Sequence, residues 1–500
     1  MRISVPWYTG FSAARGGIPS ILPVLQKGAA LASGSVAIAV SFACPAFAHG
    51  SERGFVMLLP TGYYRTGGAL AVAASFVTLA IVPAAWFKAL TRVELTCARL
   101  PCVPRNGASL FSFALLAVLF AAGLFATPDP LENLLPLTIW TVFWVGFTLL
   151  QALFGNLWPW LNPWTGPLAA LRTMTGSHLA RTALVTLPKT AGHLPASLMF
   201  LLIAWYELVS LAPDNPPELA VAAAIYWLFN LVAMIVFGQG EWMRRGEALS
   251  VFFRFVGMVA PFSGRRRRGR RWLVLTWPGR RSVTGGPLSI SATLFVLLTL
   301  ATVSFDGFSK TFTWLGSMGV NPLEFPGRSA MMTVNMFGLL AAFTALVVVF
   351  YLAVYLGNRA AAWPHRAALA ASAGLFVVSI IPISIAFHAA HYLTVLLVNG
   401  QYFAAAISDP FSLGWNLFGT AHLHPTTSFL TNLERVSILW TVQTVIVVAG
   451  HIAGITLAHM VAIEQFGTTK GAVRSQLFLA AGMVFYTVFG LWLLSTPVAG

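Results

Sequence analysis

Two histidines, His388 and His391, have the spacing that most directly indicates chemistry in this sequence. They stand three residues apart in an apolar stretch, so a helix there would place both imidazoles on one face. The same arrangement suits two ligands of one metal ion, for which zinc is the first expectation. A structural hydrogen-bond network or a proton relay would show the same spacing, and both interpretations stay open.

Carboxylates in other apolar stretches could complete a site around these histidines. Glu207 and Asp306 are expected at the same membrane depth as the two histidines. Either could be a third metal ligand or could hydrogen-bond to one of the ligands. Asp306 or Asp409 could serve as the general base, and Asp306 could instead only cap the turn before Gly307. A divalent metal bound there would lower the pKa of a bound water and supply hydroxide, which is the chemistry that a metal-dependent hydrolase would use.

A further histidine, His451, is expected near the middle of the membrane and extends the set of predicted metal ligands. His459, eight residues further on, would lie about 12 Å away along the same helix, too far to bind the same ion. A haem held between His451 and either of the paired histidines is an alternative. The sequence contains no phosphate-binding loop, zinc-protease motif, nucleophile elbow or dinucleotide fingerprint.

The elements that must position these side chains follow from composition. Of the 500 residues, 57% are hydrophobic and 9% are charged, whereas soluble domains carry about 25% charged residues. Lipid is therefore the expected main solvent, and the fold class is all-α, a polytopic transmembrane bundle of about ten helices. The expected spans are 67–88, 107–127, 134–154, 194–212, 219–239, 286–305, 330–357, 368–397, 436–460 and 474–495.

Residues 1–48 have the pattern of a secretory signal peptide. A basic start is followed by the apolar run 28–43 and by Ala46-Phe47-Ala48, which resembles a cleavage site. Residues 49–500 would then form the integral membrane domain, although an uncleaved anchor is the alternative. Cleavage would leave His49 at the N-terminus, where its amine and imidazole together suit copper.

The net charge of +16 is concentrated in alternate loops. Of the 30 Lys and Arg residues, 22 lie in the segments 88–106, 155–193, 240–285, 358–367 and 461–474. The positive-inside rule makes these loops cytosolic and both mature termini periplasmic, in a bacterial inner membrane. The Arg-rich run 265–271 then indicates topology and contact with anionic lipid, not nucleic acid.

Three smaller expectations concern the loops. Residues 247–262 could form a helix lying at the membrane interface. Glu241 and Glu247 are expected to pair with the neighbouring Arg244 and Arg245. The outer loop 398–435, which contains His422 and His424, could cap the predicted site.

Short motifs along most of the chain resemble those of the fenitrothion hydrolase family of membrane proteins. The resemblance implies hydrolysis of an organophosphorus triester, with an apolar ester entering from lipid, and it carries over no catalytic residue. The family's late motif ends His-Asp, whereas Met460 follows His459 here. The matching stretches are Ala48–Gly50, Phe143–Gly146, Leu161–Trp164, Trp205–Leu208, Gly246–Ala248, Phe305–Gly307, His388–Tyr392, Ser408–Pro410, Gly414–Gly419, Gly450–Gly454 and Ala458–His459.

Two other functions fit the same residues. In a transporter or a metal-handling protein for copper or haem, the histidines and glutamate would line a translocation path. The other alternative is a non-catalytic subunit of a complex with a second membrane protein. The lipid bilayer is the partner that all three functions share.

Overall fold

The computed structural model describes residues 59–176, 182–324, 327–362, 369–466 and 468–498, all within the unit of residues 48–500. The predicted signal peptide and His49 lie outside the described residues. Everything below concerns this larger unit.

The predicted membrane spans are present as helices. Nine helical stretches in the described residues are long and apolar enough to cross a membrane, and the shorter α10 (Leu194–Leu208) occupies the place of the tenth. The all-α, polytopic helical fold is thus confirmed. The nine are α3 (Thr61–Ile81), α5 (Arg105–Phe125), α6–η1–α7 (Leu134–Phe154), α11 (Pro216–Phe237), α15 (Ile290–Ser309), α17 (Arg328–Ala360), α18–α19 (Leu369–His391), α21 (Leu433–Phe466) and α22 (Thr469–Ser495).

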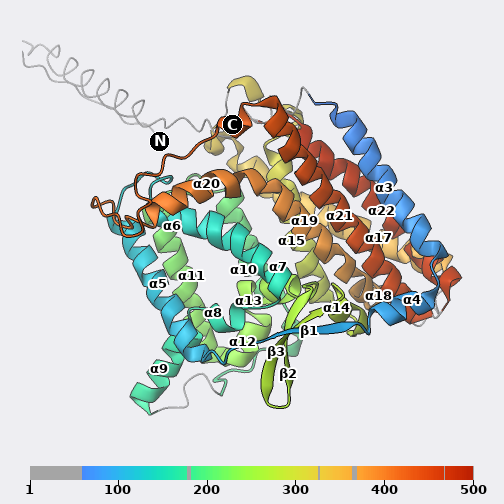
Figure 1. The fold of residues 1–500 in the computed structure, drawn as a ribbon, viewed down its shortest axis with the longest axis horizontal. Coiled ribbons are helices and arrows are strands. Elements are labelled where there is room, and N and C mark those ends of the chain that lie inside the picture. Colours follow the sequence, from blue (N-terminus) through green and yellow to red (C-terminus); the bar gives the residue numbers. More distant parts are fainter. Residues whose placement is uncertain (1–58, 177–181, 325–326, 363–368, 467, 499–500) are drawn as a thin grey trace, which may run out of the picture. The chain divides into compact units, whose positions relative to one another are not determined.

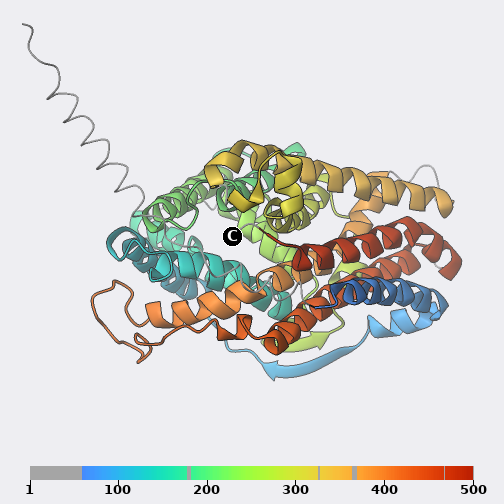
Figure 2. The same cartoon turned by 90° about the horizontal axis from the view of Figure 1, so that it is seen from above.

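Three of the spans form the centre of the bundle. In the most apolar window of α15, 78% of residues are buried, and the values for α18–α19 and α21 are 72% and 67%. In α3 the value is only 11%, and this helix packs beside α21 and α22 at the periphery (Figures 1 and 2). Apolar side chains of the peripheral helices therefore face lipid, as membrane packing allows.

Two glycines bring α21 against α19. A Cβ on Gly450 would lie 2.2 Å from Cβ of Ala386, and one on Gly454 would lie 2.7 Å from the backbone oxygen of Ser379. This is the small-xxx-small spacing that lets membrane helices approach closely. The motif Gly450–Gly454 thereby fixes the position of the helix that carries the paired histidines.

A small sheet joins two of the basic loops. It contains β1 (Glu94–Arg99), β2 (Phe262–Arg267) and β3 (Arg270–Thr276), all antiparallel in the order β1-β3-β2. The sheet was not predicted, because the run of arginines in β2 lacks the alternation of apolar and polar residues that is typical of a strand. Arg268 and Gly269, between β2 and β3, both adopt the positive φ of a tight hairpin turn. Four spans separate β1 from β2, and this even number returns the chain to the same side.

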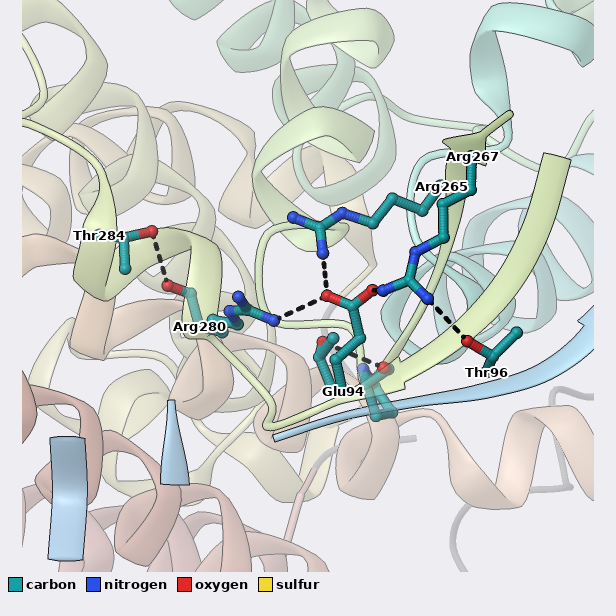
Figure 3. Close-up of polar contacts among 8 residues, drawn as sticks. Glu94, Thr96, Arg265, Arg267, Arg280 and Thr284 are labelled. Carbon is teal, nitrogen blue, oxygen red and sulfur yellow. Dashed lines mark hydrogen bonds and ion pairs between the residues drawn. The ribbon is translucent and has the colours of Figure 1, made fainter. Parts of the chain in front are cut away.

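One carboxylate connects arginines of the sheet and of the following helix. The Glu94 side chain is 8% exposed and forms ion pairs with Arg265, Arg267 and Arg280, the last at 3.0 Å from α14 (Arg280–Thr284). Figure 3 shows the three guanidinium groups converging on this carboxylate, with Arg267 also bonded to Thr96. Part of the Arg-rich run is therefore neutralised within the protein.

The predicted interfacial helix exists but is not at an interface. Helix α13 (Ala248–Val256) is buried among the spans, and Phe253 has no exposed surface. Glu247 caps this helix and accepts from the indole of Trp158 at 3.2 Å. The expected pairing with arginine is therefore wrong for Glu247, whereas Glu241 in α12 (Gln239–Arg245) does pair with its neighbours.

The predicted outer loop 398–435 begins later than expected. Tyr392 leaves the helical conformation, and α20 (Leu393–Ala406) then runs across the ends of the spans beside η1 (Figure 1). Residues 407–432 form the loop that follows, with one short 3₁₀ turn. We call this side of the bundle the α20 end and the opposite side the sheet end.

Candidate functional site

Three helices bring ionisable side chains together at the α20 end. Asp306 and Lys310 come from the end of α15, His391 and Tyr392 from the end of α19, and Glu207 from the end of α10. We call these five residues the carboxylate cluster. The sequence placed three of them at one depth, and the fold brings those three into one network.

Asp306 is the centre of the carboxylate cluster and is 2% exposed. His391 Nε2 donates to its Oδ2 at 2.8 Å, and Lys310 Nζ lies 2.7 Å from its Oδ1. Lys310 is one helical turn away, the spacing at which side chains meet on a helix surface. Asp306 thus contacts a lysine and a histidine, and its role is not limited to capping the turn before Gly307.

Tyr392 connects the two carboxyl groups. Its hydroxyl oxygen lies 3.0 Å from Oε1 of Glu207 and 2.8 Å from Oδ2 of Asp306. A phenol has one hydrogen, so it donates to only one of them at a time. The second contact becomes a hydrogen bond only when a carboxyl group carries a proton of its own.

Glu207 differs from Asp306 in its surroundings. Among the described residues, no ion pair reaches the Glu207 carboxylate. Arg328 is close, but it donates to the backbone oxygens of Glu207 and Ser210. The only polar side chain that contacts this carboxyl group is therefore Tyr392, within the part of the chain that the structure describes.

His388 points to a different partner from His391. Its Nε2 donates to the backbone oxygen of Trp144 at 2.9 Å, and its ring packs edge-on against Tyr392. Trp144 lies in η1 (Leu137–Phe147), an 11-residue π-helical segment, and such segments are frequent at functional sites. The two histidines share a helix face but do not point their Nε2 atoms at one acceptor.

A small cavity of about 30 Å³ extends from the carboxylate cluster toward the sheet end. Glu207, His388 and Tyr392 line it, together with the hydroxyl-bearing residues Thr299, Thr302 and Ser384. One water needs about 10–15 Å³, so about two fit. An organic substrate needs a pocket of about 300 Å³ or more.

Helix α13 closes the cavity toward the sheet end. Phe252, Phe255 and Val256 form this part of its lining. On the far side of Phe255 lies His193, whose ring centroid is 6.0 Å from that of Phe255. The buried phenylalanines therefore separate the cavity from a second ionisable group.

His193 precedes α10 and has a basic environment. Arg254 Nη2 donates to its Nε2 at 3.0 Å, and its backbone N–H donates to Oγ of Ser291 at 2.9 Å. Burial, followed by the positive charges of Arg254, Arg245 and Arg244, lowers the pKa of His193 to about 4. This imidazole is neutral at pH 7.

A much larger chamber of about 750 Å³ lies between α5, η1, α10 and α11. Its lining is almost entirely apolar and rich in aromatic side chains, including Trp140, Phe143 and Trp164. Trp144 lines both this chamber and the small polar cavity. The chamber is therefore next to the site and large enough for an organic ligand.

The remaining predicted residues lie apart from the carboxylate cluster. Asp409 accepts from the backbone N–H groups of Leu413 and Gly414, and so holds the loop after α20. His451 donates from Nδ1 to the backbone oxygen of Val447 and packs against Phe387. The structure thus gives both residues local partners and shows no contact between them and Asp306.

The described residues contain no group of three or more His, Cys, Asp or Glu side chains arranged to hold a metal ion. His388 uses Nε2 for a carbonyl, and His391 uses Nε2 for Asp306, so these nitrogen atoms do not converge. The donor set as it stands does not fit the predicted zinc site. Zinc binding, copper at His49 and haem stay predictions.

Sequence reasoning missed two members of the carboxylate cluster. Tyr392 was visible only as the neighbour of His391, and Lys310 only as one of few cations between alternate spans. The i, i+4 spacing of Asp306 and Lys310 was a usable signal for an ion pair. No sequence signal indicated that Tyr392 would turn inward at a break in the helix.

Comparisons with other proteins add no assignment to this geometry. A scan against family models, a search of curated proteins and a search of solved structures each find no significant match. The resemblance to the fenitrothion hydrolase family therefore stays a prediction, and the chain is described by its fold as a multi-pass helical membrane protein.

Proposed function

We propose that this membrane protein conducts protons across the membrane and that Glu207 carries the exchangeable proton. The observation behind this is the single phenolic hydrogen of Tyr392 between two carboxyl groups. Both contacts are favourable only if the cluster holds one additional proton. Asp306 has Lys310 and His391 as partners, so the proton belongs on Glu207.

The surroundings of Glu207 support this assignment. A carboxylate removed from water without a cationic partner is costly, and protonation relieves the cost. Glu207 also lines the small cavity, so a water there can take the proton from the carboxyl group. A cavity with room for about two waters suits proton transfer and excludes a larger organic substrate.

The path toward the sheet end follows α15. Thr302 and Thr299 line the cavity, and Ser291, beside His193, lies about 12 Å beyond Thr299 along the helix axis. Phe252 and Phe255 occupy the interval. We propose that movement of α13 opens this aromatic layer and alternates access between the two sides.

The orientation in the membrane is part of the same proposal. The sheet end carries most of the basic loops, so it faces the cytosol, and the carboxylate cluster faces the periplasm of a bacterial inner membrane. The exposed Lys310 side chain, 46% accessible, connects the cluster to the periplasmic side.

Infrared spectroscopy of the purified protein tests the proton directly. A neutral carboxyl group gives a C=O stretching band that shifts on exchange into D₂O, and we expect this band at pH 7 in the wild type. Glu207→Gln should remove it, whereas Glu218→Gln, an exposed acid at the start of α11, should not. A band that survives in Glu207→Gln contradicts the assignment.

Proton flux tests the function. With protein in vesicles that contain a pH-sensitive dye, an imposed membrane potential should drive acidification. Glu207→Gln should reduce the rate to that of empty vesicles, and Glu218→Gln should leave it unchanged. Equal rates for wild type and empty vesicles would exclude proton transport.

A hydrolase is the second candidate, and one observation favours it. Asp306 orients His391, a pairing that prepares an imidazole to act as a general base. The chamber behind Trp144 has the volume for an apolar ester. Hydrolysis of an organophosphorus triester by the wild type, lost in His391→Ala, would support this function.

Metal dependence is tested separately, by elemental analysis of the wild type beside the double variant His388→Ala, His391→Ala. Stoichiometric zinc lost in the double variant would support the predicted metal site. Equal metal content in the two proteins would exclude it.

A further inference from the structure

We infer that the 750 Å³ chamber is a binding site for one phospholipid with an anionic headgroup, held by Arg105 and Arg271. The inference does not depend on proton transport. It rests on three observations: an opening to the membrane, an apolar lining, and two cations beside its sheet-end rim.

The chamber is open toward lipid. Four of its lining residues are more than half exposed, with values of 65% for Phe111, 65% for Leu202, 64% for Ile225 and 52% for Phe229. These residues belong to α5, α10 and α11, so the opening lies between membrane spans. Only a molecule that is already in the bilayer can enter by this route.

The lining suits hydrocarbon. Along α5 it extends from Phe111 to Leu119, which is about 12 Å of helix. One leaflet contributes about 15 Å to the hydrocarbon core, so an acyl chain can lie along most of the chamber. Apart from Ser112 and Thr138, the side chains that line the chamber are apolar or aromatic.

Two guanidinium groups lie at the sheet end of this chamber. The central carbons of Arg105 and Arg271 are 4.6 Å and 4.4 Å from the ring centroid of Trp160, in the short helix α8 (Trp158–Leu161). Leu161, the next residue, lines the chamber, and Phe111 follows Arg105 by less than two turns of α5. Stacking on Trp160 holds both cations beside the rim.

These two arginines differ from those of the neighbouring sheet. Arg265, Arg267 and Arg280 share the carboxylate of Glu94, as Figure 3 shows. No ion pair involves Arg105 or Arg271 among the described residues. Their charge is therefore available for a phosphate, which guanidinium groups bind with paired hydrogen bonds.

The test measures lipid retained by the full chain after extraction with detergent. Protein is incubated with vesicles of phosphatidylglycerol or of phosphatidylcholine, and bound lipid is counted by native mass spectrometry. We expect about one phosphatidylglycerol per chain and at least tenfold less phosphatidylcholine, because each arginine near a headgroup adds attraction.

Two variants separate the headgroup from the chain. Arg105→Gln with Arg271→Gln should remove the preference for phosphatidylglycerol, whereas the exposed pair Arg266→Gln with Arg268→Gln should keep it. Ala223→Trp, which places a larger side chain in the chamber, should reduce retention of both lipids. Unchanged preference in the first variant, or unchanged retention in folded Ala223→Trp protein, would overturn the inference.

Discussion

The two ends of the bundle treat a histidine in opposite ways. At the α20 end, His391 bonds to the carboxylate of Asp306 at 2.8 Å. At the sheet end, His193 accepts from the guanidinium of Arg254 at 3.0 Å. The first histidine bonds to a carboxylate of the carboxylate cluster, whereas burial and the neighbouring arginines lower the pKa of the second and keep it neutral at pH 7. The sign of the partner charge therefore distinguishes the two histidines, and at His193 this charge adds to burial, which is the larger cause of the lowered pKa.

The largest effect is expected for Asp306→Asn, which removes the carboxylate that His391 contacts at the α20 end. The amide would leave His391 and Lys310 without their carboxylate, and breaking a buried pair costs about 3–5 kcal/mol. We expect a lower free energy of unfolding and no proton flux. The control Glu434→Gln, an exposed acid at the same end, should match the wild type in both measurements.

The next effect concerns acid stability and His193. Its pKa is 6.5 ordinarily and about 4 in the folded protein, so the unfolded chain binds a proton first as the pH falls. Stability from this group is complete above pH 6.5 and is lost progressively toward pH 4. His193→Gln should therefore flatten the decline of Tm between pH 7 and pH 4.5. An unchanged slope would show that His193 is not buried as described.

A smaller effect is expected for Glu94→Gln, which removes the carboxylate of the sheet end. Its partners Arg265 and Arg267 have side chains that are 51% and 48% exposed, so water can hydrate their guanidinium groups when the carboxylate is removed. We expect a loss of about 1 kcal/mol in the free energy of unfolding. Glu464→Gln, an exposed acid in the last turn of α21, is the matched control. A loss as large as that of Asp306→Asn would remove the contrast between the two ends.

The smallest effect is expected for Lys310→Met. The Lys310 side chain is 46% exposed, so its ion pair with Asp306 is partly screened and is worth less than about 1 kcal/mol. His391 would still bond to Asp306, and proton flux should persist at a reduced rate. Lys310→Arg should restore the rate, whereas a complete loss in Lys310→Met would make the lysine a required member of the network.

Most of the fold could be predicted because spans of about 20 apolar residues are determined locally. Depth along each span could be counted as well, and this placed Glu207, Asp306 and His391 correctly at one level. Rotation about each helix axis depends on packing between helices, so the different directions of His388 and His391 could not be predicted. Burial of α13 depends on the helices that pack around it, among them α7, α10 and α19, whereas its sequence alone resembles an interfacial helix.

The ion pairs of Glu94 with three arginines have a consequence for biosynthesis. Glu94 leaves the ribosome 171 residues before Arg265. At about 5–20 residues per second, translation needs roughly 10–30 s to supply the first of its partners. Four spans are synthesised during that time, and Glu94 has no arginine partner until they are complete. Closure of the sheet thus follows the synthesis of these four spans, and a chain that ends before Arg265 would lack all three arginine partners of Glu94.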